Sequence, residues 1–288
     1  MGRNIDKPNL DYQDVFYTCT STYRDESKRD RLNSYIPRTT KKILEFESLI
    51  QIDKVHELKE DKIDVANEKR YKEDMIGIYK DKFSKMNEKG RRFYDQLKLS
   101  AKGNRCPFCA HREVTTLDHL YPKAEIPSLA IAPINLVPSC FDCNKKKSTM
   151  TPDSIENTLL HPYFDDISSD IWLVVELNNQ TDLSIKYNVE KPSHWSHIKF
   201  KRLENEMELL ELFKFYATQG ITEYNIRKIS LAGAYKRHGQ SEVEQVLQEY
   251  IEASENEKGM NSWEAALYRG LLKSTWFCEG GFIESSNL

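Results

Sequence analysis

Four of the six cysteines form two C-x-x-C pairs, and this pattern constrains the fold of the chain more than any other. The pairs are Cys106 with Cys109 and Cys140 with Cys143, and 30 residues lie between them. Four thiolates on two tight turns fill the tetrahedral coordination shell of zinc, so we expect a structural site with no open position. The alternative is four cysteines buried for unrelated reasons, but such paired spacings rarely arise by chance.

Length and composition exclude several classes of protein. The 288 residues suffice for two or three packing units, and the hydrophobic fraction of 39% and the charged fraction of 30% are ordinary for a globular chain. No apolar run approaches the roughly 18 residues of a membrane helix, and the first residues contain no apolar signal segment. We therefore expect a cytoplasmic protein that does not bind membranes.

The chain divides into three expected regions, which together predict an α+β fold that is mainly helical. Residues 1–103 show helical patterns, residues 104–165 form a loop-rich, cysteine-rich module, and residues 166–288 hold a β-hairpin followed by helices. The helix breakers Gly103 and Asn104 set the first boundary.

Apolar residues at helical spacing predict helices in the first region. One helix is expected around Ile43, Phe46 and Ile50, and residues 53–74, whose charges alternate in sign, predict a solvated helical face. The apolar stripe of a further helix is Tyr71, Met75, Ile78, Tyr79, Phe83 and Met86.

The third region carries strand and helix signals. Residues 171–175 and 183–189 predict two strands of a hairpin, with the polar residues 178–182 as its turn. The N-caps expected for two later helices, each with an acidic residue three positions on, are Ser241 with Glu244 and Asn261 with Glu264. The large side chains expected in the core there are Trp263, Trp276 and Phe277.

The residues between and directly after the cysteine pairs form a second pattern. Asp118 and His119 lie in a segment expected to be a strand, and Asn135 lies in the long loop between the pairs. Asn144 and Lys147 follow the second pair, where we expect a short helix. The D-H step, the loop Asn and C-x-x-C-[HN]-x-x-K together resemble the HNH family of ββα-metal nucleases. The resemblance implies a zinc-stabilised module and a metal-dependent endonuclease.

Phosphodiester hydrolysis requires a base for water, a hard cation to offset charge on the phosphate oxygens, and a rigid frame. His119 is the expected base, and Asp118 and Asn144 can supply oxygen ligands to Mg²⁺. Lys147, one helical turn beyond Asn144, is expected to reach the scissile phosphate. The resemblance implies that Asn135 ties the loop to the strand and orients His119.

The last motif position departs from the family name, because Asn144 stands where the final His would be. An amide oxygen suits a hard cation, whereas zinc and nickel favour imidazole, so we expect catalytic Mg²⁺ with Mn²⁺ as a substitute. Two other histidines have open roles. His111 is expected in an exposed loop, with a fifth zinc ligand as the alternative, and His161 is expected to pack or cap.

Flanking segments narrow the resemblance to PtuB, the HNH nuclease subunit of the Septu antiphage system, and to its relatives encoded beside retrons. The matching segments are 116–119, 122–123, 135–140, 161–165, 263–267 and 276–277. This resemblance implies an antiphage nuclease restrained by an ABC-type ATPase partner, PtuA, and in retron-linked relatives a reverse transcriptase with its nucleic acid. The implied substrate is DNA or a structured RNA such as tRNA.

The charge distribution bears on these partners. Residues 1–100 carry 22 basic and 19 acidic side chains, residues 101–150 carry 7 and 4, and residues 151–288 carry 13 and 22. Because an acidic region repels phosphate, we expect nucleic acid at the middle segment, a protein partner at the C-terminal half, and weak nucleic-acid binding by the chain alone. A second function class stays open, a zinc-stabilised binding adaptor with an inactive site, although the complete set of motif residues argues against it.

Overall fold

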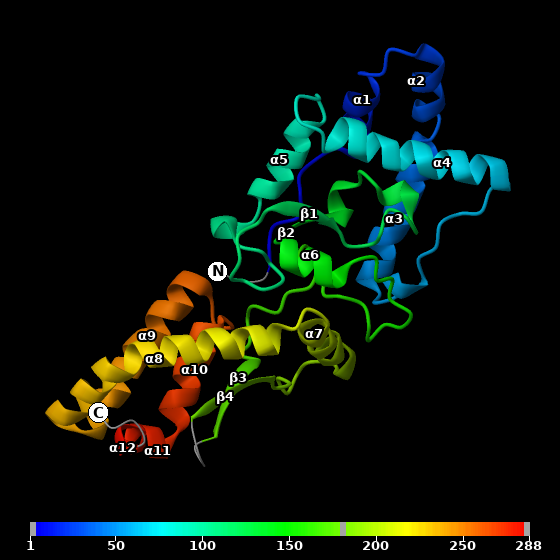
Figure 1. The fold of residues 1–288 in the computed structure, drawn as a ribbon. Coiled ribbons are helices and arrows are strands. Elements are labelled where there is room, and N and C mark those ends of the chain that lie inside the picture. The colour runs from blue at the N-terminus through cyan, green and yellow to red at the C-terminus, as the bar shows by residue number, and fades with distance from the viewer. Residues whose placement is uncertain (1–3, 179–182, 285–288) are drawn as a thin grey trace. The chain divides into compact units, whose positions relative to one another are not determined.

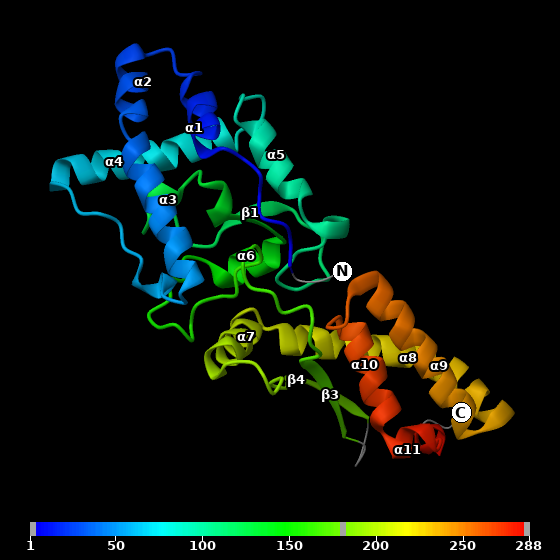
Figure 2. The same cartoon turned by 180° about the vertical axis from the view of Figure 1, so that it is seen from behind.

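The computed structural model describes residues 4–178 and 183–284, which form two compact units (Figures 1 and 2). The N-terminal unit comprises residues 4–165 with 201–206, and the C-terminal unit comprises the other described residues. Each unit is mainly helical and contains a two-stranded antiparallel sheet, so the expected α+β class is confirmed. Most of the expected hairpin turn, residues 179–182, lies outside the described residues.

Short helices dominate the N-terminal unit. In chain order its elements are α1 (Tyr12–Thr20), α2 (Glu26–Asn33), α3 (Ile36–Gln51), η1 (Val55–Glu57), α4 (Val65–Ile78), η2 (Tyr79–Phe83), α5 (Arg91–Leu99), η3 (Lys102–Asn104), β1 (Thr116–His119), η4 (Pro127–Leu129), η5 (Pro133–Asn135), β2 (Leu136–Ser139) and α6 (Phe141–Lys147). Residues 201–206 of a later helix complete this unit, because the Arg202 guanidinium binds Asp165 at 2.8 Å and Asp53 at 3.0 Å.

The C-terminal unit combines a hairpin with longer helices. Its elements are β3 (Leu173–Asn178), β4 (Ser184–Val189), the outer parts of α7 (His197–Leu209), then α8 (Leu212–His238), α9 (Gln240–Lys258), α10 (Trp263–Lys273), α11 (Thr275–Cys278) and α12 (Gly281–Glu284). Although α8 has 27 residues, neither it nor any other helix in the described chain has the length and apolar character needed to cross a membrane.

One hydrophobic core joins the N-terminal helices to the cysteine-containing module. Its fully or nearly fully buried members include Phe16 of α1, Met75 of α4, Leu97 of α5, Leu117 of β1 and Leu136 of β2. These side chains come from both sides of the expected first boundary and pack in one cluster. The N-terminal helices and the cysteine-containing module therefore pack as one compact unit, to which residues 201–206 also belong.

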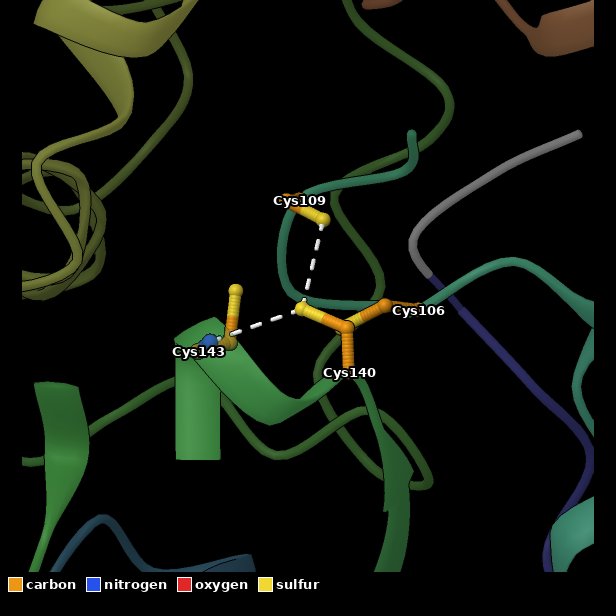
Figure 3. Close-up of side chains that lie close together, drawn as sticks. All are labelled: Cys106, Cys109, Cys140 and Cys143. Carbon is orange, nitrogen blue, oxygen red and sulfur yellow. Dashed lines mark hydrogen bonds between the residues drawn. The ribbon is translucent and has the colours of Figure 1, made fainter. Parts of the chain in front are cut away.

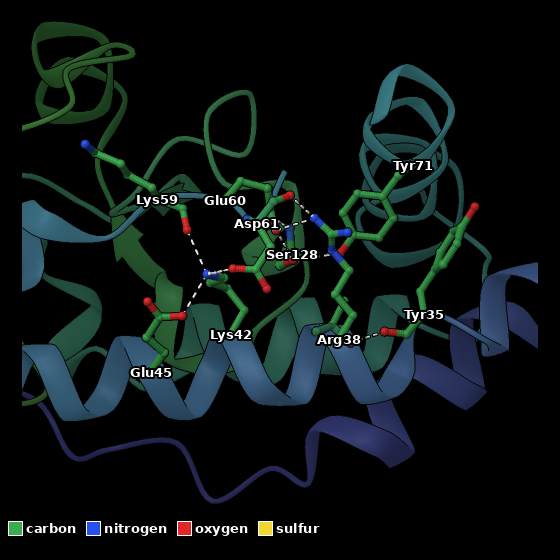
Figure 4. A network of polar contacts seen from close by, with 10 residues as sticks. Tyr35, Arg38, Lys42, Glu45, Lys59, Glu60, Asp61, Tyr71 and Ser128 are labelled. Atoms are coloured by element: carbon green, nitrogen blue, oxygen red, sulfur yellow. Dashed lines mark hydrogen bonds and ion pairs between the residues drawn. The ribbon is translucent and has the colours of Figure 1, made fainter. Parts of the chain in front are cut away.

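The charged segment 53–74, predicted to present a solvated helical face, is helical only in part. Helix α4 covers its last portion, and residues 58–64 have no regular secondary structure. The cause is the buried Lys42 of α3, whose Nζ donates to Lys59 O and to Asp61 Oδ1 at 2.7 Å each (Figure 4). Burial alone would lower the pKa of Lys42, but the carboxylates of Asp61 and Glu45, which both accept from Nζ, outweigh it and raise that pKa. The segment's charges therefore make tertiary contacts.

The predicted helix with the apolar stripe changes its geometry part-way. It ends as an α-helix at Ile78 and continues as the π-helical turn η2. The stripe residues that are buried as predicted are Tyr71, Met75, Ile78 and Phe83. Met86 was predicted on the same face but is exposed, because the helical segment ends at Phe83 and Met86 lies in the turn that follows it.

Strands β1 and β2 and helix α6 follow one another in the order expected for the module. The strands pair antiparallel, with His119 opposite Leu136 and Thr116 opposite Ser139. A long loop containing η4 and η5 connects them, and only Cys140 separates β2 from α6. This order places the D-H step and the second cysteine pair at neighbouring points of the fold.

The predicted hairpin in the C-terminal unit is confirmed, although β3 begins two residues later than expected. Tyr187 of β4 anchors it, because its hydroxyl donates to Trp263 O of α10 at 2.9 Å. Trp263 and Phe277 are buried as expected, and Trp276 is half-buried.

Both predicted N-caps of this unit are wrong by one or two residues. Gly239, with a positive φ of 69°, ends α8 and directly precedes α9, so Ser241 lies inside α9. Ser262 caps α10, since its hydroxyl accepts a backbone N–H of the first turn at 3.3 Å. The neighbouring Asn261 accepts the Trp172 N–H at 2.9 Å and so ties α10 to the start of β3.

Candidate metal centre and catalytic cleft

The four predicted zinc ligands come together in the N-terminal unit (Figure 3). The sulfur atoms of Cys106, Cys109, Cys140 and Cys143 all lie within 4.8 Å of one another, and all four residues are buried. Cys109 Sγ and Cys140 Sγ are 4.0 Å apart, close to the edge of about 3.8 Å in a tetrahedron with Zn–S bonds of about 2.3 Å. The cluster therefore has the size and the donor set for a tetrahedral metal ion such as zinc.

Backbone hydrogen bonds hold the sulfur atoms in place. Cys140 is the N-cap of α6, and its Sγ accepts the Cys143 N–H at 3.4 Å. In the first pair the Arg112 N–H donates to Cys109 Sγ, also at 3.4 Å. Such donors favour thiolate over thiol. Because Cys140 is both a ligand and a helix cap, α6 begins at the metal centre.

The electrostatics of the cluster favour a bound cation. Hydrogen bonds from the other three thiols hold the pKa of Cys109 far below its ordinary value, while contacts with the same group raise the pKa of Cys143. The opposite shifts have one cause, which is that neighbouring thiolates repel one another, so the last protons are hard to remove. A divalent cation removes this conflict, because its charge stabilises every thiolate in the group.

Strand β1 and helix α6 also contribute to an open cleft of about 760 Å³. The lining residues with chemical or binding potential are Asp118 and His119 of β1, Phe141, Asn144 and Lys145 of α6, Tyr79 and Lys80 of η2, and Lys123 of the connecting loop. Three of the five predicted catalytic residues, Asp118, His119 and Asn144, thus share one cleft. The other two, Asn135 and Lys147, lie behind its walls and are buried.

His119 is held as a neutral imidazole. Its side chain is 7% exposed, and Nε2 lies 2.8 Å from the Ala130 carbonyl oxygen, to which it donates. Burial, aided by the positive charge of Lys123, lowers the pKa of His119 to about 3. The Tyr79 ring meets the imidazole edge-on with 4.4 Å between ring centroids. Because Nε2 carries the proton, Nδ1 carries the lone pair that can accept a proton from water.

Asp118 presents one oxygen that suits a cation. Its Oδ1 accepts a hydrogen bond from Lys147 Nζ at 3.3 Å, whereas Oδ2 is buried and has no hydrogen-bond partner among the described residues. Burial raises the pKa of Asp118 to about 6, although the Lys147 charge lowers it in part. An unpartnered buried carboxylate oxygen is costly, and a hard divalent cation would satisfy it. Asp118 therefore fits the predicted role of metal ligand.

Lys147 has a structural task in this geometry. The residue is 2% exposed, and its ammonium donates to His119 O at 2.6 Å as well as to Asp118. These bonds fasten the end of α6 to β1. Since Lys147 does not line the cleft, its expected contact with the scissile phosphate stays a prediction.

Asn135 cross-links two points of the loop that connects β1 to β2. Its Oδ1 accepts the Tyr121 N–H at 2.8 Å, and its Nδ2 donates to Tyr121 O at 3.0 Å and to Leu129 O at 3.2 Å. Leu129 directly precedes Ala130, the partner of His119. Asn135 thus acts on His119 through the loop backbone, without touching the imidazole.

The N-terminal helices support the same loop (Figure 4). Glu60 accepts from Ser128 twice, from its N–H and from its hydroxyl, each at 2.9 Å, and also pairs with Arg38 of α3 at 3.1 Å. The Tyr71 hydroxyl of α4 lies 2.6 Å from Ser128 Oγ. Since Ser128 is two residues from Ala130, this network fixes the carbonyl that holds His119.

Sequence reasoning gave no role to several residues of the cleft. Phe141 directly follows Cys140, and Lys123 lies in the matching segment 122–123, so the sequence did contain a signal for a place of both residues near the site. Tyr79 of the cleft, and Glu60, which binds Ser128 of the loop without lining the cleft, are distant in the chain, and their positions gave no signal. Of the histidines with open roles, His161 packs in the core with Nε2 2.9 Å from Ile134 O, and His111 is not part of the sulfur cluster.

Comparisons with known proteins find a similarity that extends along nearly the whole chain. No family model matches the chain, and no solved structure matches it. Protein ea31 of Escherichia phage lambda is 25% identical to it over 298 aligned residues, which cover 96% of this chain and 99% of the phage protein. The chain is therefore similar to a phage protein along nearly its whole length.

We expect the purified protein to contain one zinc ion per chain. Cys140→Ser removes both a ligand and a helix cap, so zinc should be lost and the N-terminal unit should unfold, because small zinc sites contribute about 10–16 kcal/mol against a net domain stability of about 5–15 kcal/mol. Cys278→Ala removes a buried thiol outside the cluster and should keep the zinc. Elemental analysis with thermal melts checks this, and a stable wild type without zinc would contradict it.

Proposed function

We propose that the protein is a metal-dependent endonuclease of the HNH type, which hydrolyses phosphodiester bonds in DNA or in a structured RNA such as tRNA. The observation that carries the proposal is that Asp118, His119 and Asn144 line one cleft. They lie on a β-β-α arrangement next to a cluster of four cysteines, in the order of the HNH motif. A base and two oxygen donors in one cleft are the groups that this reaction requires.

Each side chain has a defined task in the proposed reaction. His119 accepts a proton from water at Nδ1, while its Nε2–H stays on Ala130 O and keeps the ring oriented. Asp118 Oδ2 and the Asn144 amide oxygen would hold Mg²⁺ or Mn²⁺. That cation, when bound, offsets the negative charge that develops on the phosphate oxygens. Lys123 adds a positive charge at the same cleft.

The proposal includes control by a second protein. Residues 151–288 carry 22 acidic and 13 basic side chains, a balance that repels phosphate and suits a protein partner. The proposed partner is an ABC-type ATPase of the PtuA kind, and the proposed setting is antiphage defence, with a retron reverse transcriptase and its nucleic acid as further partners.

One observation favours a second function. The Lys147 ammonium lies 3.3 Å from Asp118 and offsets part of the negative charge that would attract a cation. Without that cation the protein would be a zinc-stabilised adaptor that binds nucleic acid or protein and does not cut. Dependence of cleavage on a divalent cation distinguishes the two functions.

His119→Ala should abolish cleavage, and because the side chain is buried and bonded to Ala130 O, a melting curve of the variant accompanies the assay to show that it is folded. Loss of a general base lowers the rate by about 100- to 10,000-fold. The assay uses the full chain, with its ATPase partner where needed, on plasmid DNA and on tRNA with Mg²⁺ or EDTA. His194→Ala changes an exposed histidine outside the cleft and serves as the matched control. If His119→Ala cuts at the wild-type rate, or if EDTA has no effect, the proposed mechanism is wrong.

Asn144→Ala should weaken the affinity for the catalytic cation, so that cleavage falls and is partly restored at higher Mg²⁺ concentration. Asn144→His keeps a ligand but a softer one, and should shift the preference from Mg²⁺ toward Mn²⁺, Co²⁺ or Ni²⁺. Metal titrations of the cleavage rate, run beside melting curves, check this. Lower melting temperatures with unchanged metal dependence in both variants would remove Asn144 from the site.

A further inference from the structure

We propose that Phe141 is a stacking platform for an unpaired nucleobase, and that the cleft therefore takes single-stranded nucleic acid or an unpaired loop. The inference rests on the proposed nuclease function and specifies its substrate class. It starts from a residue to which the HNH pattern assigns no role.

Phe141 is a large apolar side chain that is exposed to solvent, so packing in the core does not explain its presence. It is 64% exposed, although it lines the cleft and is the first residue of α6. Its backbone is fixed on both sides, since Cys140 and Cys143 belong to the sulfur cluster. A rigid, solvent-exposed aromatic ring loses little conformational entropy when a flat apolar partner covers it. A nucleobase is such a partner.

Lysines line the same cleft as the ring and can bind the phosphates of a nucleic acid. Lys80, Lys123 and Lys145 all line the cleft, and Lys145 Nζ lies 5.9 Å from the centroid of the Phe141 ring. Asp118 is the one acidic residue among the cleft-lining residues of the described chain. An aromatic platform combined with lysines for the backbone is the usual composition of sites that bind single strands.

The spacing along α6 fixes where the stacked base lies. Phe141 and Asn144 are three residues apart, so they share one helix face with about 5–6 Å between their Cβ atoms. A base on Phe141 therefore belongs to a nucleotide next to the phosphate held near Asn144. In a duplex both faces of each base are covered by its neighbours, so only an unpaired base can take this position.

The test is a binding measurement on full-length His119→Ala protein with Mg²⁺, which separates binding from cleavage. Fluorescence anisotropy is read with a single-stranded DNA oligonucleotide, a single-stranded RNA of the same sequence, and duplex DNA. Adding Phe141→Ala should weaken binding of single strands by about 5- to 150-fold, the effect of losing one stacked base, and leave duplex binding unchanged. Phe141→Trp should retain the affinity, because it keeps an aromatic face.

Tyr17→Ala is the matched control, because Tyr17 is an exposed aromatic residue of α1 that does not line the cleft, and it should change nothing. The two single strands distinguish an unpaired DNA base from an unpaired RNA base. Equal binding by the Phe141→Ala and parent proteins, or an equal loss for the duplex, overturns the platform. That outcome leaves the nuclease proposal standing if wild-type protein still cuts in a His119-dependent manner.

Discussion

The junction between β2 and α6 is the constraint on which the rest of the site depends. Cys140 directly follows the strand, caps the helix and contributes one of four clustered sulfur atoms. The far end of the helix is fixed as well, because Lys147 donates to His119 O at 2.6 Å. With both ends held, the face that carries Phe141 and Asn144 has one orientation relative to β1. A seven-residue helix has too few internal hydrogen bonds to be stable without such anchors.

The segment 58–64 and helix α4 together support the backbone around a single carbonyl group. Glu60 and Tyr71 hold Ser128, and the backbone near Ser128 presents Ala130 O to the imidazole of His119. In the proposed reaction the orientation of the His119 ring is decisive, since a general base must lie within hydrogen-bond distance of the proton that it accepts. The cysteine-containing module shares one core with the N-terminal helices, and this shared packing holds the loop that orients His119. The same burial desolvates His119 and lowers its pKa to about 3.

The sequence predicted those features that depend on short-range spacing. The two C-x-x-C pairs and the D-H step lie within one contiguous segment, so their geometry follows from turns and a strand that the residues themselves favour. Features that depend on tertiary contacts were missed. Lys42 contacts the backbone of Lys59, 17 residues away, and Tyr79 packs on His119, 40 residues away. Lys147 points inward to Asp118, 29 residues away. A spacing of three residues placed Lys147 and Asn144 on one helix turn but could not show which acceptors the ammonium would meet.

We propose that a divalent cation binds between Asp118 and Asn144, beside a separate zinc centre. Crystals soaked in Mn²⁺ and measured at wavelengths on either side of the manganese and zinc absorption edges test it most directly. We expect an anomalous peak for zinc inside the four-sulfur cluster. We expect a second peak, for manganese, at about 2.0–2.2 Å from Asp118 Oδ2 and from the Asn144 amide oxygen. A map with manganese elsewhere, and no peak at Asp118 in protein that cleaves nucleic acid, would contradict it.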